Sequence, residues 1–177
     1  MEYLRDYAMY AAVFGLFSMS WFGWAQEKPR ESWRLYLGIA SGLALLVCLT
    51  GVYLSITNWS APSALNDDRA FRAYLIAFYT EIVLAGGGSY LLYRAKKKDF
   101  TAPWITFIVG LHFISLKSVF EDSGLYVLAA LMVAVAAVSV YVARRLGVAP
   151  SAITGIGSGA SLFVFALLGL LRFFTAS

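Results

Sequence analysis

Six apolar runs, each long enough to cross a lipid bilayer as a helix, dominate this sequence of 177 residues. A transmembrane helix needs about 20 consecutive, mostly apolar residues. Charged or turn-forming residues separate each run from the next. The pattern predicts an all-α bundle of six transmembrane helices in a single domain, residues 1–177. The predicted spans are 7–25, 35–56, 71–93, 103–120, 125–143 and 151–173.

Composition agrees with this class. Hydrophobic residues make up 60% of the chain and charged residues only 14%, whereas a typical soluble domain has about 25% charged residues. The formal charge of +4 arises in short loops between the runs, so membrane orientation explains it better than nucleic-acid binding, which we do not expect. The first run lacks a small-residue cleavage site and leads directly into a charged loop, so we expect it to be retained as a span.

Basic residues concentrate in the first, third and fifth loops, 26–34, 94–102 and 144–150. Lys and Arg are enriched in cytoplasmic loops of membrane proteins, which predicts that these loops are cytoplasmic and that both termini lie outside, in a cell (inner) membrane. The nine basic residues on this side are Lys28, Arg30, Arg34, Arg94, Lys96, Lys97, Lys98, Arg144 and Arg145. The other side has five: Arg5, Arg69, Arg72, Lys117 and Arg172.

Two ionisable residues interrupt the centres of neighbouring predicted spans. Glu81 lies in the third span and His112, the single histidine, lies in the fourth. An ionisable group in hydrocarbon is costly and therefore marks a candidate functional site. A short connection makes the two spans antiparallel neighbours, so we expect Glu81 and His112 to be in contact. Such a pair could carry a proton or could be a hydrogen bond that only holds two helices together.

Two further polar residues follow His112 in the fourth span. Ser115 is three residues on, so its hydroxyl could face the same side of the helix. Lys117 could extend toward the membrane surface and pair with Glu121 at i+4, or it could line an outward-facing cavity with His112. We therefore include Glu81, His112, Ser115 and Lys117 in a candidate transport or proton site.

Glycine clusters occur in two spans: Gly86, Gly87 and Gly88 in the third, and Gly155, Gly157 and Gly159 in the sixth. Glycines weaken a helix and are tolerated where a helix breaks beside a cavity or where backbones pack closely. We expect one of these roles here, so a bulky residue at Gly87 should separate helices. A homo-oligomer could form through Gly38 and Gly42 in the second span.

Weak internal similarity hints at a 3+3 inverted repeat, an arrangement typical of transporters. Spans one and four share a Gly-Leu pair, at Gly15 and Gly110, and spans two and five share a Val-Tyr pair, at Tyr53 and Tyr141. Spans three and six do not match well. Chance recurrence in a chain rich in Gly, Val and Leu explains the same observations.

Enzymatic and metal-binding signatures are scarce. A single His and the single Cys48 cannot supply a two-His metal site, a bis-His haem or a zinc site within one chain. Glu81 is the one acid inside a span, so paired-carboxylate catalysis has no second group. We expect no metal or other cofactor, and an enzyme is not the favoured interpretation.

The stretch Ile108-Val-Gly-Leu-His-Phe113, followed by Leu125-Tyr-Val127, resembles a group of small, poorly characterised bacterial multi-pass membrane proteins that carry Gly-Leu-His-Phe inside a helix. The likeness covers spans three to five. It departs from the group's pattern at Ile114-Ser-Leu116, where a proline is expected. The resemblance implies a six-span bacterial membrane protein and supplies no activity.

Three functional hypotheses follow. The first is a proton-coupled transporter of a small solute or ion, in which Glu81 and His112 titrate. The second is a non-catalytic membrane subunit or sensor, in which the same pair is structural. The third is an intramembrane enzyme for a lipid or isoprenoid that uses His112 and Ser115. The expected partners are the lipid bilayer and an unidentified small solute or ion.

Overall fold

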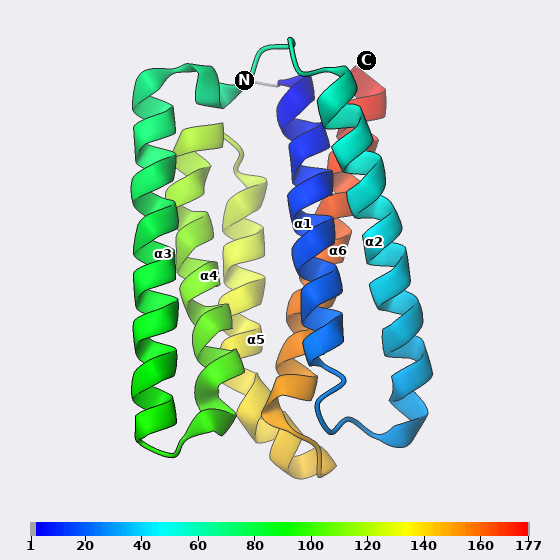
Figure 1. Cartoon of the computed structure of the whole chain (residues 1–177), viewed down its shortest axis with the longest axis vertical. Coiled ribbons are helices and arrows are strands. Elements are labelled where there is room, and N and C mark those ends of the chain that lie inside the picture. The colour runs from blue at the N-terminus through cyan, green and yellow to red at the C-terminus, as the bar shows by residue number, and fades with distance from the viewer. Residues whose placement is uncertain (1–2, 177) are drawn as a thin grey trace.

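A computed structural model describes residues 3–176 as an antiparallel bundle of six long helices (Figure 1). Each helix overlaps one predicted span, which confirms the all-α prediction. The helices are α1 (Leu4–Trp24), α2 (Arg34–Thr57), α3 (Asp68–Arg94), α4 (Thr101–Phe120), α5 (Gly124–Leu146) and α6 (Pro150–Ala176). Three short 3-10 turns, η1 (Glu31–Trp33), η2 (Ala64–Asn66) and η3 (Lys98–Phe100), precede α2, α3 and α4.

Local sequence signals account for the helix ends. The Asp67 side chain accepts hydrogen bonds from the Arg69 and Ala70 amides and caps the start of α3. Pro103 lies in the first turn of α4, where a missing backbone N–H does no harm. Gly147 ends α5 with a φ of 68°, a left-handed conformation that glycine adopts without strain.

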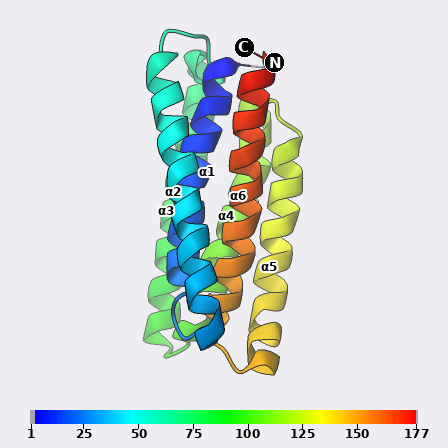
Figure 2. The ribbon, with the colours of Figure 1, turned by 90° about the vertical axis from the view of Figure 1, so that its right-hand side faces the viewer.

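Both termini lie at one end of the bundle (Figures 1 and 2). The three basic loops, which join α1 to α2, α3 to α4 and α5 to α6, lie together at the opposite end. The sequence-based grouping of these loops on one face is therefore confirmed. The α4–α5 connection is tight because Glu121 adopts a left-handed conformation, with φ 52° and ψ 27°.

The helices form two packed groups that share one core. In one group α1 packs against α2 and α6, and in the other α4 packs against α3 and α5. Contacts of α6 with α5 and α4 join the groups. Aromatic pairs between α1 and α4 do the same, because Phe14 meets Phe113 edge-on at 5.6 Å and Tyr10 meets Phe120 at 5.5 Å. The largest fully buried side chains include Leu125, Leu128, Met132 and Leu162.

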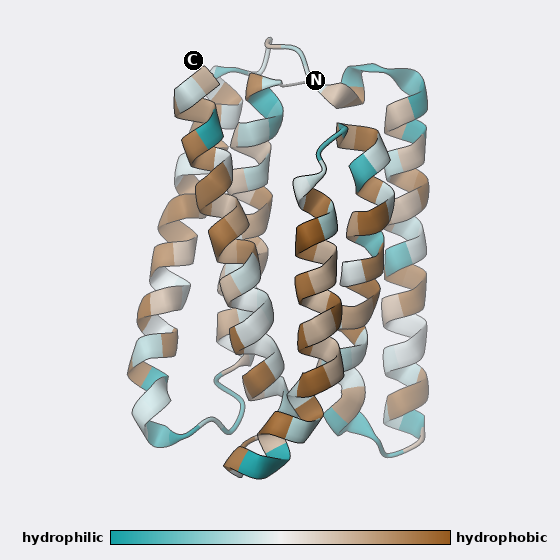
Figure 3. Ribbon diagram, turned by 180° about the vertical axis from the view of Figure 1, so that it is seen from behind, coloured by the Kyte–Doolittle hydropathy of each residue, from teal (hydrophilic) through white to brown (hydrophobic). Residues whose placement is uncertain are grey.

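Five helices, α2 to α6, are long and apolar enough to cross a membrane. Their outer faces expose large aliphatic side chains; Val83 is 68% exposed and Leu91 67%. Figure 3 shows hydrophobic residues along the helices and hydrophilic residues at the two ends. Because contiguous exposed apolar surface needs an apolar environment, the fold indicates a multi-pass membrane protein. The remaining long helix, α1, has ten buried residues, many of them Tyr, Trp, Ser or Gly. It lies between α2 and α6 and packs against both.

The glycine clusters do not break their helices, so that part of the prediction is wrong. Both α3 and α6 are continuous through their glycines. At Gly86 and Gly87 an added Cβ would meet nothing within 4 Å, so the expected close packing at Gly87 is also wrong. Gly88 does pack closely, against Trp104 of α4. The remaining glycines of these clusters, all in α6, pack against α1 or α5; they are Gly155, Gly157 and Gly159.

Candidate functional site

The contact between α3 and α4 places the two mid-span ionisable residues together. Glu81 is at the midpoint of α3, and Ala77 precedes it by one turn on the same face. His112 lies near the middle of α4. The Nδ1 atom of His112 is 3.2 Å from Oε2 of Glu81. The predicted contact between Glu81 and His112 is therefore present in the structure.

A second acceptor defines how the imidazole ring is held. The same Nδ1 atom is 3.3 Å from the backbone oxygen of Ala77. A carbonyl oxygen can only accept, so this contact is favourable when Nδ1 carries the proton. In that tautomer one N–H points between the Ala77 oxygen and the Glu81 carboxylate. The arrangement orients the ring toward α3. It also gives the Glu81 carboxylate an N–H donor, on a ring that is positively charged when both of its nitrogens are protonated.

The Glu81–His112 pair lies on the wall of a groove of about 460 Å³ between α3 and α4, which we call the mid-span groove. The Glu81 side chain is 24% exposed and that of His112 is 9% exposed, so the pair is accessible from the groove. Three hydroxyl-bearing side chains add polarity to a largely apolar lining. The full lining is Ala73, Ile76, Ala77, Thr80, Glu81, Leu84, Ile108, Leu111, His112, Ser115 and Ser118.

The structure brings Ser115 to this groove but not Lys117. Ser115 lines the groove beside His112, yet no hydrogen bond joins the two side chains in the described part of the chain. Lys117 instead places its Nζ 5.7 Å from the ring centre of Tyr126 on α5. The expected i+4 pair with Glu121 does not form, because α4 ends at Phe120 and Glu121 leaves the helical path.

A second polar attachment fixes α3 to α4 nearer the basic loops. The indole Nε1 of Trp104 donates to the backbone oxygen of Leu84 at 3.0 Å. Gly88 lies one turn beyond Leu84, and the missing side chain gives the Trp104 ring its place. Sequence reasoning identified Gly88 but did not pair it with Trp104. The signal that could have done so is that both residues lie within two helical turns of the α3–α4 loop.

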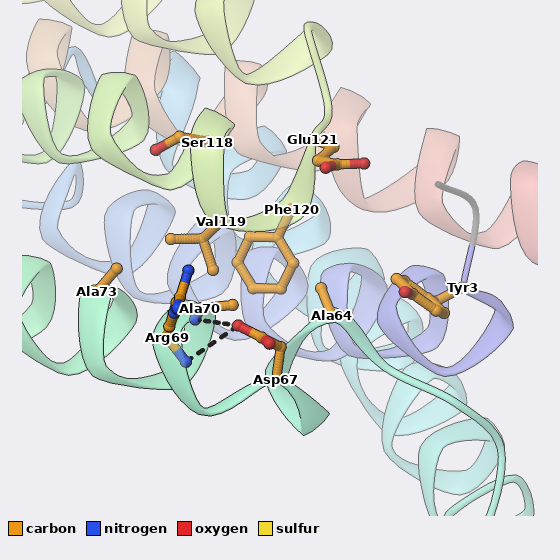
Figure 4. Close-up of a pocket in the computed structure, with 10 residues that line it drawn as sticks. All are labelled: Tyr3, Ala64, Asp67, Arg69, Ala70, Ala73, Ser118, Val119, Phe120 and Glu121. Carbon is orange, nitrogen blue, oxygen red and sulfur yellow. Dashed lines mark hydrogen bonds between the residues drawn. The ribbon is translucent and has the colours of Figure 1, made fainter.

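The mid-span groove continues toward the end that carries the termini. A second cavity of about 530 Å³, the terminal cavity, shares the lining residues Ala73 and Ser118 with the groove. Figure 4 shows Asp67 and Arg69 on the α3 side of this cavity and Ser118 and Glu121 on the α4 side. Sequence reasoning counted Arg69 only as a loop charge. Its place in the first turn of α3 is the feature that puts it beside the terminal cavity.

Separate polar contacts at the same end join α6 to the α4–α5 turn and α1 to η2. Arg172 donates to the Asp122 carboxylate at 2.7 Å, and Asp122 also accepts from the Gly124 amide. The buried Asp6 accepts from the Ala64 amide at 2.8 Å. These contacts close the end of the bundle, and sequence analysis did not identify them.

The chemistry available at the mid-span groove is proton exchange. Glu81 and His112 can share, accept or release protons, and the neighbouring hydroxyls can orient water or a ligand. Within residues 3–176 no group of three His, Cys, Asp or Glu side chains is placed to hold a metal ion.

No protein-family model matches this chain, and the comparisons with curated proteins and with solved structures give no match. The resemblance to small bacterial membrane proteins at residues 108–113 therefore stays a prediction.

Proposed function

We propose that the chain is a six-span protein of a bacterial cell membrane and a proton-coupled transporter of a small solute or ion, with Glu81 and His112 as its titrating pair. The observation that carries this proposal is the 3.2 Å contact between the two side chains at mid-height, on the wall of a groove. Ionisable groups in spans commonly mark proton relays or ion pathways.

Exposure of the pair favours a titrating role over a purely structural one. A structural hydrogen bond between helices works best when it is sealed from competing partners. Here Glu81 is 24% exposed, and the hydroxyls of Thr80 and Ser115 line the same groove. The groove therefore gives the carboxylate access to a proton donor or to a ligand.

The packing of α3 supports a moving part. In α3 no residue is buried, and among the long helices it packs mainly on α4. A helix held by so little buried surface can shift against its neighbour at low free-energy cost. Such a shift would open or close the groove around the pair, as alternating access requires.

Helix pairing is compatible with the 3+3 inverted repeat. The α1–α2 hairpin packs with α6, and the α4–α5 hairpin packs with α3. If the two halves of the repeat are α1–α3 and α4–α6, this pattern means that each half packs its third helix against the other half. Glu81 on α3 and His112 on α4 then lie where the two halves meet. In this arrangement the loops 26–34, 94–102 and 144–150 face the cytoplasm, as their Lys and Arg content predicts.

A second candidate is an intramembrane enzyme acting on a lipid or isoprenoid. The groove favours it, because α3 is at the edge of the bundle (Figure 1) and a lipid could enter from the side. The pair His112 and Ser115 would be the reacting groups. The absence of a hydrogen bond between them among the described residues weakens this hypothesis relative to transport.

The test measures proton entry into liposomes that contain the purified protein and an internal pH-sensitive dye. Solutes from a panel of small organic anions, organic cations and inorganic ions are added outside. At least one solute should accelerate acidification, and Glu81→Gln should abolish the effect while the protein stays folded. The matched control is Glu27→Gln, in a loop at the basic end.

Two results would contradict transport by this pair. The first is that no solute changes proton entry relative to empty liposomes. The second is that Glu81→Gln and Glu27→Gln behave alike, which would leave the pair as a structural contact in a non-catalytic subunit or sensor.

A further inference from the structure

The terminal cavity and the mid-span groove adjoin along α3, and together they outline a path from Arg69 to Glu81. They share Ala73 and Ser118, so a ligand bound at the end of the bundle can extend toward Glu81 and His112. From Arg69 to Glu81 the path is about 18 Å long, at 1.5 Å per helical residue. Its walls between these points are mostly apolar, with Ile76 and Leu111 on facing helices.

An unpaired guanidinium lies at the outer end of this path. Within residues 3–176 the Arg69 side chain has no hydrogen bond or ion pair, although Arg69 lines the terminal cavity. Two other arginines near the termini differ: Arg5 donates to the Trp59 oxygen, and Arg172 pairs with Asp122. A free guanidinium is suited to a carboxylate, with which it forms two parallel hydrogen bonds.

Two acids, Asp67 and Glu121, also line the terminal cavity. The Asp67 carboxylate accepts from the Arg69 and Ala70 amides, so it is already engaged as the cap of α3. Glu121 lies across the cavity on the α4 side, as Figure 4 shows. The acid across the cavity therefore faces Arg69 from the opposite wall, and the charge of the acid beside Arg69 is partly offset by its two amide donors.

We infer that this path binds a single-chain carboxylic acid, with its carboxylate at Arg69 and its hydrocarbon chain along α3 and α4 toward Glu81. The inference rests on the proposed function and names its substrate class. A weak acid suits a path that ends at a titrating pair, because its protonated form carries no charge into the hydrocarbon region. The mid-span groove lies between two helices and has mostly apolar walls, which suits one hydrocarbon chain, whereas a phospholipid would bring two.

The experiment measures the thermal stability of the full-length protein in phosphatidylcholine nanodiscs as laurate is added. The extended chain of laurate roughly matches the length of the path. Laurate should raise the melting temperature in a saturable manner, whereas dodecanol and dodecylamine should not. Arg69→Gln should weaken laurate binding about tenfold, the equivalent of one charge-assisted hydrogen bond.

Arg72→Gln is the matched control, because Arg72 lies on the same helix one turn away and does not line the cavity. It should leave laurate binding unchanged, and Arg69→Lys should restore part of the affinity. Equal effects of the Arg69 and Arg72 variants would overturn the inference, as would equal binding of dodecanol or preferential binding of dodecylamine. Loss of laurate binding when phosphatidylglycerol replaces phosphatidylcholine would also overturn it, since the site would then take a phospholipid headgroup.

Glu81→Gln separates this inference from the proposed function. Laurate should still bind this variant through Arg69, whereas proton-coupled transport should be lost. Laurate binding without any proton coupling in the wild-type protein would contradict the transport proposal and would support the carboxylic-acid site alone. Proton coupling to another solute without laurate binding would contradict only the substrate class.

Discussion

Two helices of equal length, α3 and α6, have opposite roles in this bundle. Each has 27 residues, and each is apolar enough to span a membrane. Yet α6 has ten buried residues and packs against α1, α5, α4 and α2, whereas α3 has none and packs mainly on α4. We therefore expect the α1–α6 contact to contribute most to the stability of the protein, and α3 to be the helix that can shift.

The two helices also differ in how they are attached. Glycines let α6 lie directly against the α1 backbone; an added Cβ at Gly155 would come within 2.5 Å of the Trp21 oxygen. By contrast, α3 is attached to α4 by polar contacts at two levels of the bundle. At mid-height His112 contacts Ala77 and Glu81, and nearer the basic loops Trp104 donates to the Leu84 oxygen. Close apolar packing gives rigidity, whereas a few hydrogen bonds can be exchanged for others as a ligand arrives.

The largest difference in stability between the two helices should appear when a glycine in each is replaced by leucine. Gly155→Leu should destabilise the protein by more than about 3 kcal/mol, because the obstructing atoms are backbone atoms and the Ala25 Cβ, none of which can turn aside. Gly87→Leu should be neutral or stabilising by up to about 1 kcal/mol, since the site is open and Leu favours helix. Thermal unfolding in detergent measures both. Equal destabilisation of the two variants would remove the distinction between α3 and α6.

A smaller effect is expected from removing a buried leucine. Leu128→Ala on α5 should destabilise the protein by about 2 kcal/mol through the cavity it leaves, the lower end of the usual range because lipid solvates apolar groups well. Leu91→Ala on α3, where the side chain is 67% exposed, should change stability by less than about 0.5 kcal/mol. A larger loss at Leu91 than at Leu128 would show that α3 carries core packing.

The smallest effect concerns the polar contact between the two helix groups. The buried hydroxyls of Thr106 on α4 and Ser158 on α6 are 3.0 Å apart. Thr106→Val should destabilise the protein by about 0.6 kcal/mol, as is typical for hydrogen bonds between membrane helices. A double-mutant cycle with Ser158→Ala measures the coupling. A coupling energy of zero would mean that the groups are joined by apolar packing alone.

Much of the fold follows from the sequence because apolar length and loop charge are local properties. They give the six helices, the antiparallel order and the common end of the basic loops. The Glu81–His112 contact also follows, since a short loop makes α3 and α4 neighbours and the depths of the two residues match. The packing of α6 on α1 does not follow, because it joins opposite ends of the chain.

The errors at individual residues have a common cause. Whether a glycine is closely packed depends on its neighbour, so identical residues at Gly87 and Gly88 have different surroundings. The direction of Lys117 depends on Tyr126, on the next helix. The cavity beside Arg69 depends on the distance between α3 and α4. None of these features is visible in the sequence of a single helix.

The central claim is that Glu81 and His112 titrate as one unit on the adaptable side of the bundle. Infrared difference spectroscopy can follow the carboxyl band of Glu81, identified by its loss in Glu81→Gln, as pH is varied. Replacing His112 by Gln should move the midpoint of that band by about one pH unit or more, as expected for strongly coupled groups. An unchanged midpoint in His112→Gln would show that the two groups titrate independently and would contradict the account.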